Sequence, residues 1–546
     1  MASVCSIPAA AEAASHSAAA RHRDARRIVH RGPLASIAPP IPPGGSRWYA
    51  APRAHAASVL EENQLVGTSS WRLAGDSTFG GEVVGDVEGY VSNQAPRAGE
   101  TETVYVNAPD AKFVSLNLYR VGWYDGTGGR LVMATGLLPA VAQAPCIHDT
   151  LSGITECDWQ PTFTFQIPSD LTSGVYIVKM STDTGEEADC MFVLRPSTPP
   201  RILVQIPMST YQAYNFWGGD SLYPDGLPLT AFGGTTQGYE VSFDRPYEDD
   251  AAPESDTGAG EFLMRDVALV RFLERYGYPV GYTTDFSIAE EPSQLRGASV
   301  VIDSGHSEYW STSQYEAFME ARERGTSLLF LSSDTAAWRV RYESAGSNSS
   351  DPGAPFRTIT SYKQNENVDP DKVEPTGLFP FGGAPLTGSA YDGCITPRSK
   401  PTGPPDYRYF RWRPDPTLTP RWLFQGTGLT ARSTVPGIAG YELDQRDSFT
   451  PPNVETVGES VDATCRRIAH TGNIGETTLF TAPSGALVFA AGMLGWLYGL
   501  NPIEGATANM PAHASPAIVR MTRNVLARAL ATSSVALSRH GRRRRD

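Results

Sequence analysis

The sequence predicts a multidomain protein, in which an all-β sandwich of the immunoglobulin-like type is followed by a doubly wound α/β domain. Between about 58 and 198, short stretches alternate apolar and polar residues and are separated by Gly, Pro and Asp turns. From 199 onward, continuous apolar runs of the buried parallel type alternate with helical patterns. The 52 Gly and 43 Pro indicate many turns and long loops, as expected for such an architecture.

The first domain is predicted from strand-like alternation. It occurs at 103–106, 113–119, 162–167 and 174–180. An aromatic and glycine-rich stretch, 119–126, carries a charged pair. We interpret it as a structural corner that packs against the next domain, in preference to a carbohydrate- or partner-binding patch.

The second domain, 199–536, is predicted from alternating strands and helices. Strands are expected at 201–206, 278–283, 298–302, 327–331 and 486–491. Helices are expected at 261–276, at 315–324 and at 516–530, because their apolar residues recur at helical spacing. A helix start at Ser311 has Gln314 as a capping-box partner.

The two ends of the chain differ in composition from the rest. Residues 1–57 are predicted to be a disordered or targeting leader, since they are poor in acidic residues and lack the apolar segment of a secretory signal. Residues 537–546 are predicted to be a basic tail. The net charge of −14 argues against a nucleic-acid partner, and no apolar run reaches the roughly 18–20 residues of a membrane span.

The six cysteines show no zinc-type spacing. Cys146 and Cys157 bracket a short loop and are candidates for a disulfide, as are Cys394 and Cys465. Such bonds favour an oxidising compartment, either extracellular or in the cell envelope, although the sequence leaves localisation open.

Polar loops follow several of the predicted strands. The strand at 298–302 leads into a small-residue turn with His306, Glu308 and Tyr309, and the first strand leads into a loop rich in tyrosine, 208–226. Another polar loop, 332–341, follows the strand at 327–331. Because the carboxyl ends of parallel strands meet at one edge of a sheet, we expect these loops to lie together.

Together with two further segments, these loops carry a family resemblance. The set consists of TYQAYNFWGGDSLYPDG, SFDRPY, DSGHSEYWS, SSDTAAWRVR, SYKQ, GYELD and AAGMLGWLYGL. It resembles the large (beta) subunit of N,N-dimethylformamidase and its relatives, over roughly residues 60–535. The resemblance implies an α/β domain similar to class I glutamine amidotransferases, with a mononuclear iron bound by two tyrosines and one glutamate.

The resemblance also implies which residues form the site. The ligands would be Glu308, Tyr214 and Tyr223, with Tyr211 and Tyr247 as alternates for the tyrosines. His306 and Glu442 correspond to acid/base groups or to groups that contact the metal ligands without binding the metal. Lys363 corresponds to an active-site lysine. Asp334, also expected at the catalytic site, stands where relatives often have Asn, so this added carboxylate leaves the substrate open.

The resemblance implies a metal-dependent hydrolase of the C–N bond in a small-molecule amide. Phenolate and carboxylate oxygens are hard donors that match Fe(III), and such an ion polarises a carbonyl and acidifies water. One alternative is a non-catalytic, amidotransferase-like envelope protein that binds a glycan or a partner through its β-sandwich. Another is a metal-assisted hydrolase of a lactone or a carbohydrate-derived substrate. The small subunit of dimethylformamidase is not in this chain, and a homo-oligomer or a partner chain is compatible with the sequence.

Overall fold

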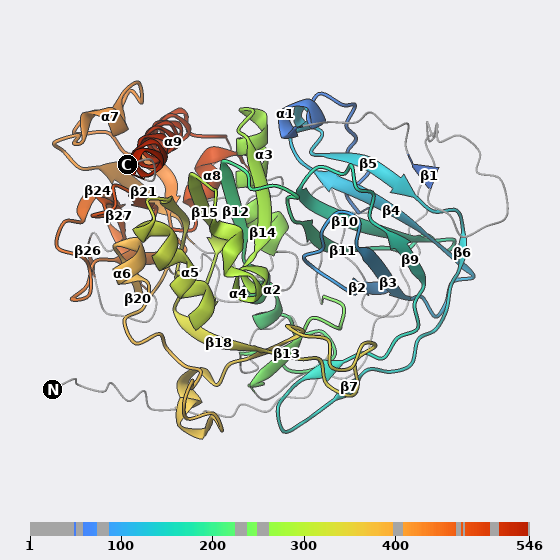
Figure 1. The fold of residues 1–546 in the computed structure, drawn as a ribbon. Coiled ribbons are helices and arrows are strands. Elements are labelled where there is room, and N and C mark those ends of the chain that lie inside the picture. Colours follow the sequence, from blue (N-terminus) through green and yellow to red (C-terminus); the bar gives the residue numbers. More distant parts are fainter. Residues whose placement is uncertain are drawn as a thin grey trace, which may run out of the picture. The chain divides into compact units, whose positions relative to one another are not determined.

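The computed structural model describes residues 49–50, 58–73, 87–223, 237–247, 261–396, 408–465, 471–472, 475–502 and 513–543. All of them belong to one compact unit, 44–546. The described chain is β-rich and contains several sheets (Figure 1). The boundary predicted near 198 therefore stays a prediction. Of the predicted leader, only Tyr49–Ala50 lies within the described residues, as the short strand β1 that pairs with β5 (Gly129–Ala134).

Two antiparallel sheets are formed by the first part of the chain. One has the order β1-β5-β4-β10-β11, with β6 paired to β4, and the other has the order β2-β3-β9. The remaining strands are β2 (Glu88–Val91), β3 (Thr101–Asn107), β4 (Phe113–Val121), β6 (Leu138–Pro139), β9 (Phe163–Gln166), β10 (Gly174–Thr182) and β11 (Glu187–Leu194). All four strand stretches predicted in this region are confirmed, whereas the immunoglobulin-like type stays a prediction.

The strand β10 shows how this region is packed on both of its faces. Tyr176, Val178 and Met180 lie in an apolar cluster shared with the β2-β3-β9 sheet. The alternate residues Val175 and Ile177 belong to a different cluster, which continues into the second half of the chain. Because side chains alternate between the two faces of a strand, β10 connects two cores.

A nine-stranded sheet dominates the second half of the chain. Its order is β14-β12-β15-β17-β28-β27-β24-β21-β22. The strands are β12 (Ile202–Ile206), β14 (Val280–Thr284), β15 (Val300–His306), β17 (Ser327–Ser333), β21 (Phe410–Pro414), β22 (Val435–Ala439), β24 (Glu455–Val461), β27 (Glu476–Thr481) and β28 (Leu487–Ala490). The first five strands in this order are parallel, and all five were predicted.

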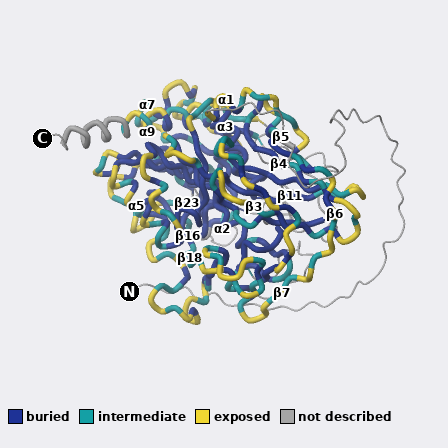
Figure 2. The backbone as a smooth tube through the Cα atoms, turned by 45° about the vertical axis from the view of Figure 1, so that its right-hand side comes forward, coloured by how far each residue is buried: buried dark blue, intermediate teal, exposed yellow. Residues whose placement is uncertain are grey.

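The other four strands of this sheet pair antiparallel, which the prediction of a doubly wound domain did not include. They come from residues 408–481, where the sequence shows no continuous apolar run. Their burial explains why: β21 and β24 mix buried with exposed or partly exposed positions, and two of their pairings contain register shifts. By contrast, every residue of β12, β15 and β17 is buried. The buried residues of the described chain gather in its interior, drawn dark blue in Figure 2.

Helices pack on both faces of the parallel strands. Val204 and Ile302 share a cluster with α3 (Val267–Arg275), α8 (Trp496–Leu500) and α9 (Pro516–Arg543). Leu203 and Val301 share another cluster with α4 (Asp285–Glu290) and α5 (Thr312–Glu323). A five-residue π-helical segment, η2 (Phe262–Asp266), precedes α3. The last helix is longer than predicted, since α9 continues to Arg543 and thus into the predicted basic tail.

The start of α5 is capped only in part as predicted. The Ser311 hydroxyl accepts a hydrogen bond from the Gln314 backbone N–H, 3.1 Å away. The Gln314 side chain, however, donates to Gln205 on β12 at 2.9 Å, where the sequence analysis expected it to close a capping box. The strand β15 is also longer than the predicted strand at 298–302, since it continues through the predicted turn to His306.

Smaller sheets surround these two regions. A four-stranded sheet has the order β13-β19-β18-β16, and three further pairs are β7-β8, β20-β23 and β25-β26. Their strands are β7 (Ile147–His148), β8 (Thr155–Glu156), β13 (Glu240–Ser242), β16 (Tyr309–Ser311), β18 (Trp338–Glu343), β19 (Thr358–Thr360), β20 (Ala390–Ile395), β23 (Glu442–Gln445), β25 (Ala463–Thr464) and β26 (Thr471–Gly472). The remaining short helices are α1 (Val59–Glu62), η1 (Tyr124–Gly126), α2 (Met208–Ala213), η3 (Pro292–Leu295), η4 (Lys363–Val368), α6 (Ala384–Thr387) and α7 (Arg421–Phe424). Among the helices of the described residues, none has the length and apolar character needed to cross a bilayer.

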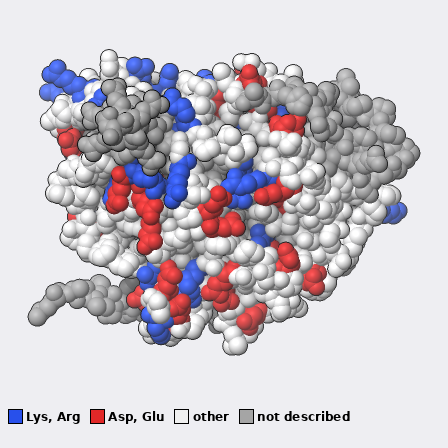
Figure 3. Space-filling model, in the orientation of Figure 1, with Lys and Arg blue, Asp and Glu red and all other residues white. Residues whose placement is uncertain are grey.

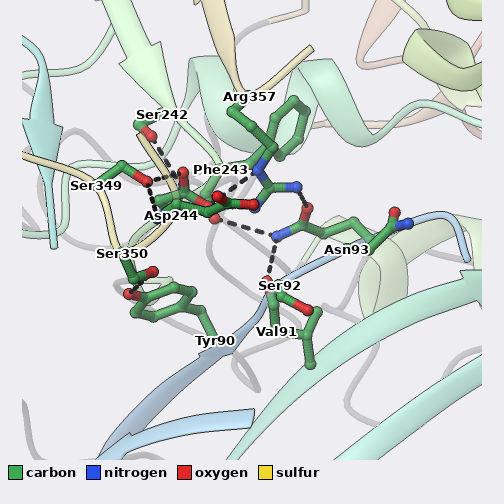
Figure 4. A network of polar contacts seen from close by, with 12 residues as sticks. Tyr90, Val91, Ser92, Asn93, Ser242, Phe243, Asp244, Ser349, Ser350 and Arg357 are labelled. Carbon is green, nitrogen blue, oxygen red and sulfur yellow. Dashed lines mark hydrogen bonds and ion pairs between the residues drawn. The ribbon is translucent and has the colours of Figure 1, made fainter. Parts of the chain in front are cut away.

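Polar and covalent links join these pieces. Both predicted disulfides, Cys146–Cys157 and Cys394–Cys465, are formed. Arg357 makes an ion pair with Asp244 at 2.5 Å, and Asp244 also accepts from the Ser349 hydroxyl at 2.6 Å (Figure 4). The same guanidinium donates to Gln94, just after β2, so this buried network connects the early strands to the loops around β13.

The aromatic and glycine-rich stretch 119–126 is a structural corner, as predicted. Arg120 forms a fully buried ion pair with Glu274 on α3, at 2.8 Å. Tyr124 donates a hydrogen bond to Glu62 on α1 at 2.6 Å. These contacts hold the early sheets against the helix that covers the nine-stranded sheet.

Candidate active site and metal centre

The site is assembled at the carboxyl ends of three neighbouring parallel strands. β12 leads into α2 and Tyr214, β15 ends at His306, and β17 ends just before Asp334. The register of the sheet pairs His306 with Ser333. The polar loops therefore meet at one edge of the sheet, as the sequence analysis predicted.

The oxygen-bearing side chains of three residues from two of these loops converge. The Tyr214 hydroxyl donates to Glu308 Oε2 at 3.0 Å, and the Tyr223 hydroxyl lies 2.8 and 2.9 Å from the two Glu308 oxygens. The two hydroxyls are 2.7 Å apart, and the phenol rings stack with their centroids separated by 4.3 Å. The Trp338 indole N–H donates to Glu308 Oε1 at 2.7 Å and fixes the carboxylate from the other side.

This oxygen cluster meets the requirements of a site for a hard cation. Burial, together with the Glu308 carboxylate, raises the pKa of Tyr214 and of Tyr223 well above the ordinary phenol value. In the protein alone both phenols are therefore held neutral beside an anion. Tyr214, Tyr223 and Glu308 would favour their anionic forms beside a cation, because its charge would offset the repulsion between phenolates and a carboxylate at these distances. The donor set is thus compatible with the predicted iron.

His306 lies between carboxylates on both sides of its ring. Its Nε2 atom is 2.9 Å from Glu442 Oε2 and 3.5 Å from Glu308 Oε2, and its Nδ1 atom is 3.3 Å from Glu261 Oε1. Complete burial alone would lower the pKa of His306, but the Glu442 and Glu261 carboxylates raise it well above its usual range. The imidazole is therefore held in its protonated form in the protein alone.

Asp334 completes a second group of donors beside the first. Its backbone has a left-handed φ of 57°, which Asp tolerates better than most residues, and its N–H donates to Asp444 Oδ1 at 2.9 Å. Burial and the Glu308 and Glu442 carboxylates raise the pKa of Asp334 well above its usual range. Ligand atoms of His306, Asp334 and Glu442 lie within 4.8 Å of one another, so this group is an alternative donor set for a metal.

Lys363 contacts the tyrosine side of the site. Its ammonium donates to the Tyr309 hydroxyl at 2.8 Å and lies 3.2 Å from the centroid of the Tyr223 ring. A cation above a phenol ring is stabilised by the ring's electrostatics and positions that ring in turn. The predicted active-site lysine is therefore in direct contact with one of the predicted ligands.

The structure brings seven of the predicted site residues together and turns the hydroxyl of one alternate, Tyr211, to another partner. Those together are Tyr214, Tyr223, His306, Glu308, Asp334, Lys363 and Glu442. Tyr211 instead donates to Asp266 Oδ2 on η2, at 2.6 Å. Tyr247 is buried in the large apolar cluster, next to residues 248–260, which lie outside the described part of the chain. The roles assigned to all these residues stay predictions.

Four residues of the site were not predicted. Trp338 and Asp444 belong to motifs that carry the resemblance, but nothing in the sequence showed that they contact Glu308 and Asp334. Tyr309 was placed in the polar turn but given no role, and its hydroxyl accepts a hydrogen bond from Lys363. Glu261 was assigned only to the start of a helix. Glu261 and Arg265 are four residues apart, so a helix places them on one face, where they form an ion pair at 2.6 Å. This spacing is visible in the sequence, but it does not show that Glu261 contacts His306.

A protein family and a curated protein are similar to this chain. The family model described as N,N-dimethylformamidase beta subunit-like, C-terminal, matches residues 115–511. A curated relative, the N,N-dimethylformamidase beta subunit of Alcaligenes sp, is 22% identical over 411 residues, which cover 64% of this chain and 52% of that protein. This chain thus spans about half the length of that relative.

A solved structure of a Paenibacillus sp. cycloisomaltooligosaccharide glucanotransferase in complex with cycloisomaltoheptaose matches with a TM-score of 0.16 and 9% identity. The match covers 62% of this chain and 63% of that one. So low a TM-score carries no argument about fold or function. The family model, by contrast, spans most of the chain, including every strand end that builds the site. The chain therefore belongs to the N,N-dimethylformamidase beta subunit-like family.

Proposed function

We propose that this protein is a metal-dependent hydrolase that cleaves the C–N bond of an amide, with a single iron ion as its metal. The observation that carries the proposal is the convergence of the Tyr214, Tyr223 and Glu308 oxygens beside the His306–Glu442 ion pair. Membership of the N,N-dimethylformamidase beta subunit-like family supports an amide as substrate.

Tyr214, Tyr223 and Glu308 would hold the ion. Two phenolates and one carboxylate provide three negative charges from hard oxygen donors, which suits Fe(III). When bound, such an ion supplies Lewis-acid polarisation of a carbonyl and a water of lowered pKa. Trp338 and Lys363 orient this donor set, one by its hydrogen bond to Glu308 and the other by its contact with the Tyr223 ring.

The His306–Glu442 pair would move protons during hydrolysis. Glu442 Oε2 would accept a proton from the attacking water, and the protonated His306, whose Nε2 lies 2.9 Å away, would give its Nε2 proton to the departing nitrogen, which must leave as a neutral amine. Transfer of the water-derived proton from Glu442 to His306 Nε2 would then restore both groups. Glu261 fixes the imidazole from its Nδ1 side, and Arg265 pairs with Glu261.

We also propose that the second half of the chain is related to the class I glutamine amidotransferases in fold but not in chemistry. Parallel strands with helices on both faces support the likeness in fold. A cysteine nucleophile is not available at this edge of the sheet from Cys394 or Cys465, because these two are joined in a disulfide. We propose that water is the attacking nucleophile.

Metal analysis of the purified protein, combined with a panel of amide substrates, tests the proposed function. We expect about one iron per chain and a visible absorption band from phenolate-to-iron charge transfer. Glu308→Ala should lose the metal, and Tyr223→Phe should lose most of the band. Tyr211→Phe is the matched control, since its hydroxyl binds Asp266, and it should keep both.

Two results would contradict the assignment. Unchanged iron content in Glu308→Ala would place the metal elsewhere, and loss of iron in Asp334→Asn together with retention in Tyr223→Phe would favour the His306, Asp334 and Glu442 set. A protein without stoichiometric metal and without amide hydrolysis would instead support a non-catalytic binding role.

The relative from Alcaligenes is named as a subunit, and we propose that this chain also works in an assembly. Light scattering coupled to size exclusion tests this. A mass above that of one 58.9 kDa chain is the expected result, and a monomer with full activity would contradict it.

A further inference from the structure

Arg265 is a fully buried arginine that holds two different partners. Its Nη1 atom pairs with Glu261 Oε2 at 2.6 Å. Its Nη2 atom donates to the Tyr441 hydroxyl at 2.7 Å, and the guanidinium carbon lies 5.2 Å from the centroid of the Tyr441 ring. Because a guanidinium is planar and carries its donors in a rigid fork, it keeps two partners in fixed directions, which the single ammonium of a lysine does not.

Each partner of Arg265 leads to one member of the His306–Glu442 pair. Glu261 Oε1 lies 3.3 Å from His306 Nδ1. Tyr441 directly precedes Glu442 in the chain, and its ring meets the imidazole edge to face, with the centroids 6.2 Å apart. The contacts form a closed cycle, because Glu442 Oε2 lies 2.9 Å from His306 Nε2. Every residue in this cycle is at most 4% exposed, so the protein itself must hold these side chains in place.

A π-helical segment brings Arg265 to this cycle of contacts. The segment is η2, which begins directly after Glu261 and contains Arg265. Its last residue, Asp266, accepts a hydrogen bond at 2.5 Å from the hydroxyl of Ser304 on β15, the strand that ends at His306. Short π-helical turns occur often at functional sites. The segment thus anchors Arg265 to the strand that carries the imidazole.

We infer that Arg265 is a positioning residue that fixes the distance between His306 and Glu442. It holds the imidazole through Glu261 and the carboxylate through Tyr441. This inference rests on the proposed function and deepens it, since it names the group that keeps the proton-transferring pair aligned. A misplacement of about 1 Å slows a reaction by about 100-fold, so this alignment has a direct effect on the rate.

Three variants separate the two partners of Arg265. Tyr441→Phe removes the hydroxyl and keeps the ring, Arg265→Lys keeps a charge beside Glu261 but loses the fork, and Arg265→Met removes both contacts. In the metal-containing protein, with N,N-dimethylformamide as the probe, we expect kcat to fall by about tenfold in each of the first two variants and by about 100-fold in the third. KM and iron content should stay native, since the guanidinium acts on the pair and not on the proposed metal ligands.

The double variant Arg265→Lys/Tyr441→Phe tests whether both residues act through one contact. It should be no slower than either single variant, because the second change finds that contact already lost. Tyr282→Phe is the matched control, since it removes another buried tyrosine hydroxyl, which donates to Glu274 on α3 at 3.0 Å, and it should keep the native kcat. Multiplied losses in the double variant would overturn the inference, and so would a native kcat in Arg265→Met. Loss of iron from Tyr441→Phe or Arg265→Lys would also overturn it, because Arg265 would then support the metal site.

Crystal structures of the same variants give a readout that does not depend on hydrolysis. We expect the separation between His306 Nε2 and Glu442 Oε2 to lengthen by about 0.5 Å or more in Arg265→Lys and Arg265→Met, which exceeds the tolerance of a catalytic geometry, and to stay native in Tyr282→Phe. An unmoved pair would overturn the inference. A native protein that hydrolyses no amide would contradict the proposed function, while the separation in the variants would still decide the inference.

Discussion

Glu308 is the residue on which the polar contacts of the site converge. Two phenols and one indole N–H surround its carboxylate, and His306 Nε2 lies 3.5 Å away. The pairing of β16 with β18 aligns Tyr309 with Trp338 and so positions the indole beside the residue before Tyr309. A carboxylate held in this way would need little reorganisation to bind a cation.

Removal of the indole donor should weaken metal binding without unfolding the protein. Trp338→Phe keeps an aromatic ring but loses the 2.7 Å hydrogen bond to Glu308. Loss of a group that orients a ligand lowers metal affinity by about 10- to 100-fold, which chelator competition measures. Trp422→Phe on α7, which contacts Arg528, is the control. Native affinity in Trp338→Phe would show that the indole does not orient the carboxylate.

Glu102 should make stability depend on pH. Burial raises its pKa from 4.5 to about 7, although the Ser92 hydroxyl and the Asn93 N–H donate to it. The folded state therefore keeps a proton that the unfolded state releases above about pH 4.5. The stabilisation is complete below that pH and is lost as pH rises to about 7, by on the order of 3 kcal/mol.

Denaturant titrations between pH 4 and pH 8 test this expectation. Glu102→Gln cannot ionise, so the native protein should lose stability relative to this variant as pH rises, and the two should run parallel above about pH 7. A constant difference between them across the whole range would show that Glu102 titrates at its ordinary pKa in the folded protein.

At the scale of single elements, the hairpin β7–β8 supports the loop that carries both tyrosines. Thr155 donates to the Gly218 carbonyl at 3.2 Å, and His148 lies 3.5 Å from Asp220. The backbone N–H of Tyr239 donates to the Ser152 carbonyl in the hairpin turn, at 2.6 Å. An element from the early part of the chain thus positions Tyr223, which lies in the second half.

The disulfide that closes this hairpin should affect both stability and the site. The double variant Cys146→Ser/Cys157→Ser removes a cross-link with a sequence separation of 11 residues, which should lower the free energy of unfolding by about 2–3 kcal/mol. Metal affinity should fall with it, because the loop at 214–223 loses support. Denaturation and chelator competition measure the two effects, and unchanged values for both would show that hydrogen bonds alone hold the hairpin.

At the scale of the whole molecule, the two halves share one apolar core. Val175 and Ile177 of β10 belong to the same cluster as Leu269 and Phe272 of α3. Because this cluster joins the halves through buried contacts, we expect them to unfold together.

On the face drawn in Figure 3, the charged side chains gather over part of the surface, with basic and acidic groups intermixed.

The buried ion pair between Arg120 and Glu274 tests this coupling. Both side chains are fully buried, and Glu274 also accepts from Tyr282 and Asn63. Arg120→Met leaves the carboxylate without its cation and should cost about 3–5 kcal/mol, in one cooperative transition. The double variant Arg120→Met/Glu274→Met should be less destabilised than the single one. Two separate transitions in denaturant would contradict a shared core.

The strands that build the site could be predicted because local sequence determines them. Residues 201–206, 298–302 and 327–331 are continuous apolar runs, and a strand buried on both faces requires such a run. The order of these strands in a parallel sheet then brings their carboxyl ends together, so the loops with Tyr214, His306 and Asp334 could be expected at one edge. Half-exposed strands such as β21 and β24 lack this signal and were missed.

Only the tertiary structure determined which side chains touch. Trp338 reaches Glu308 through the pairing of two short strands, and Glu261 reaches His306 across 45 residues of sequence. The choice of Tyr223 over Tyr211 also depends on packing, since Tyr211 is turned toward Asp266. Sequence patterns report burial and local geometry, whereas contacts between distant residues depend on how whole elements pack, which no local pattern encodes.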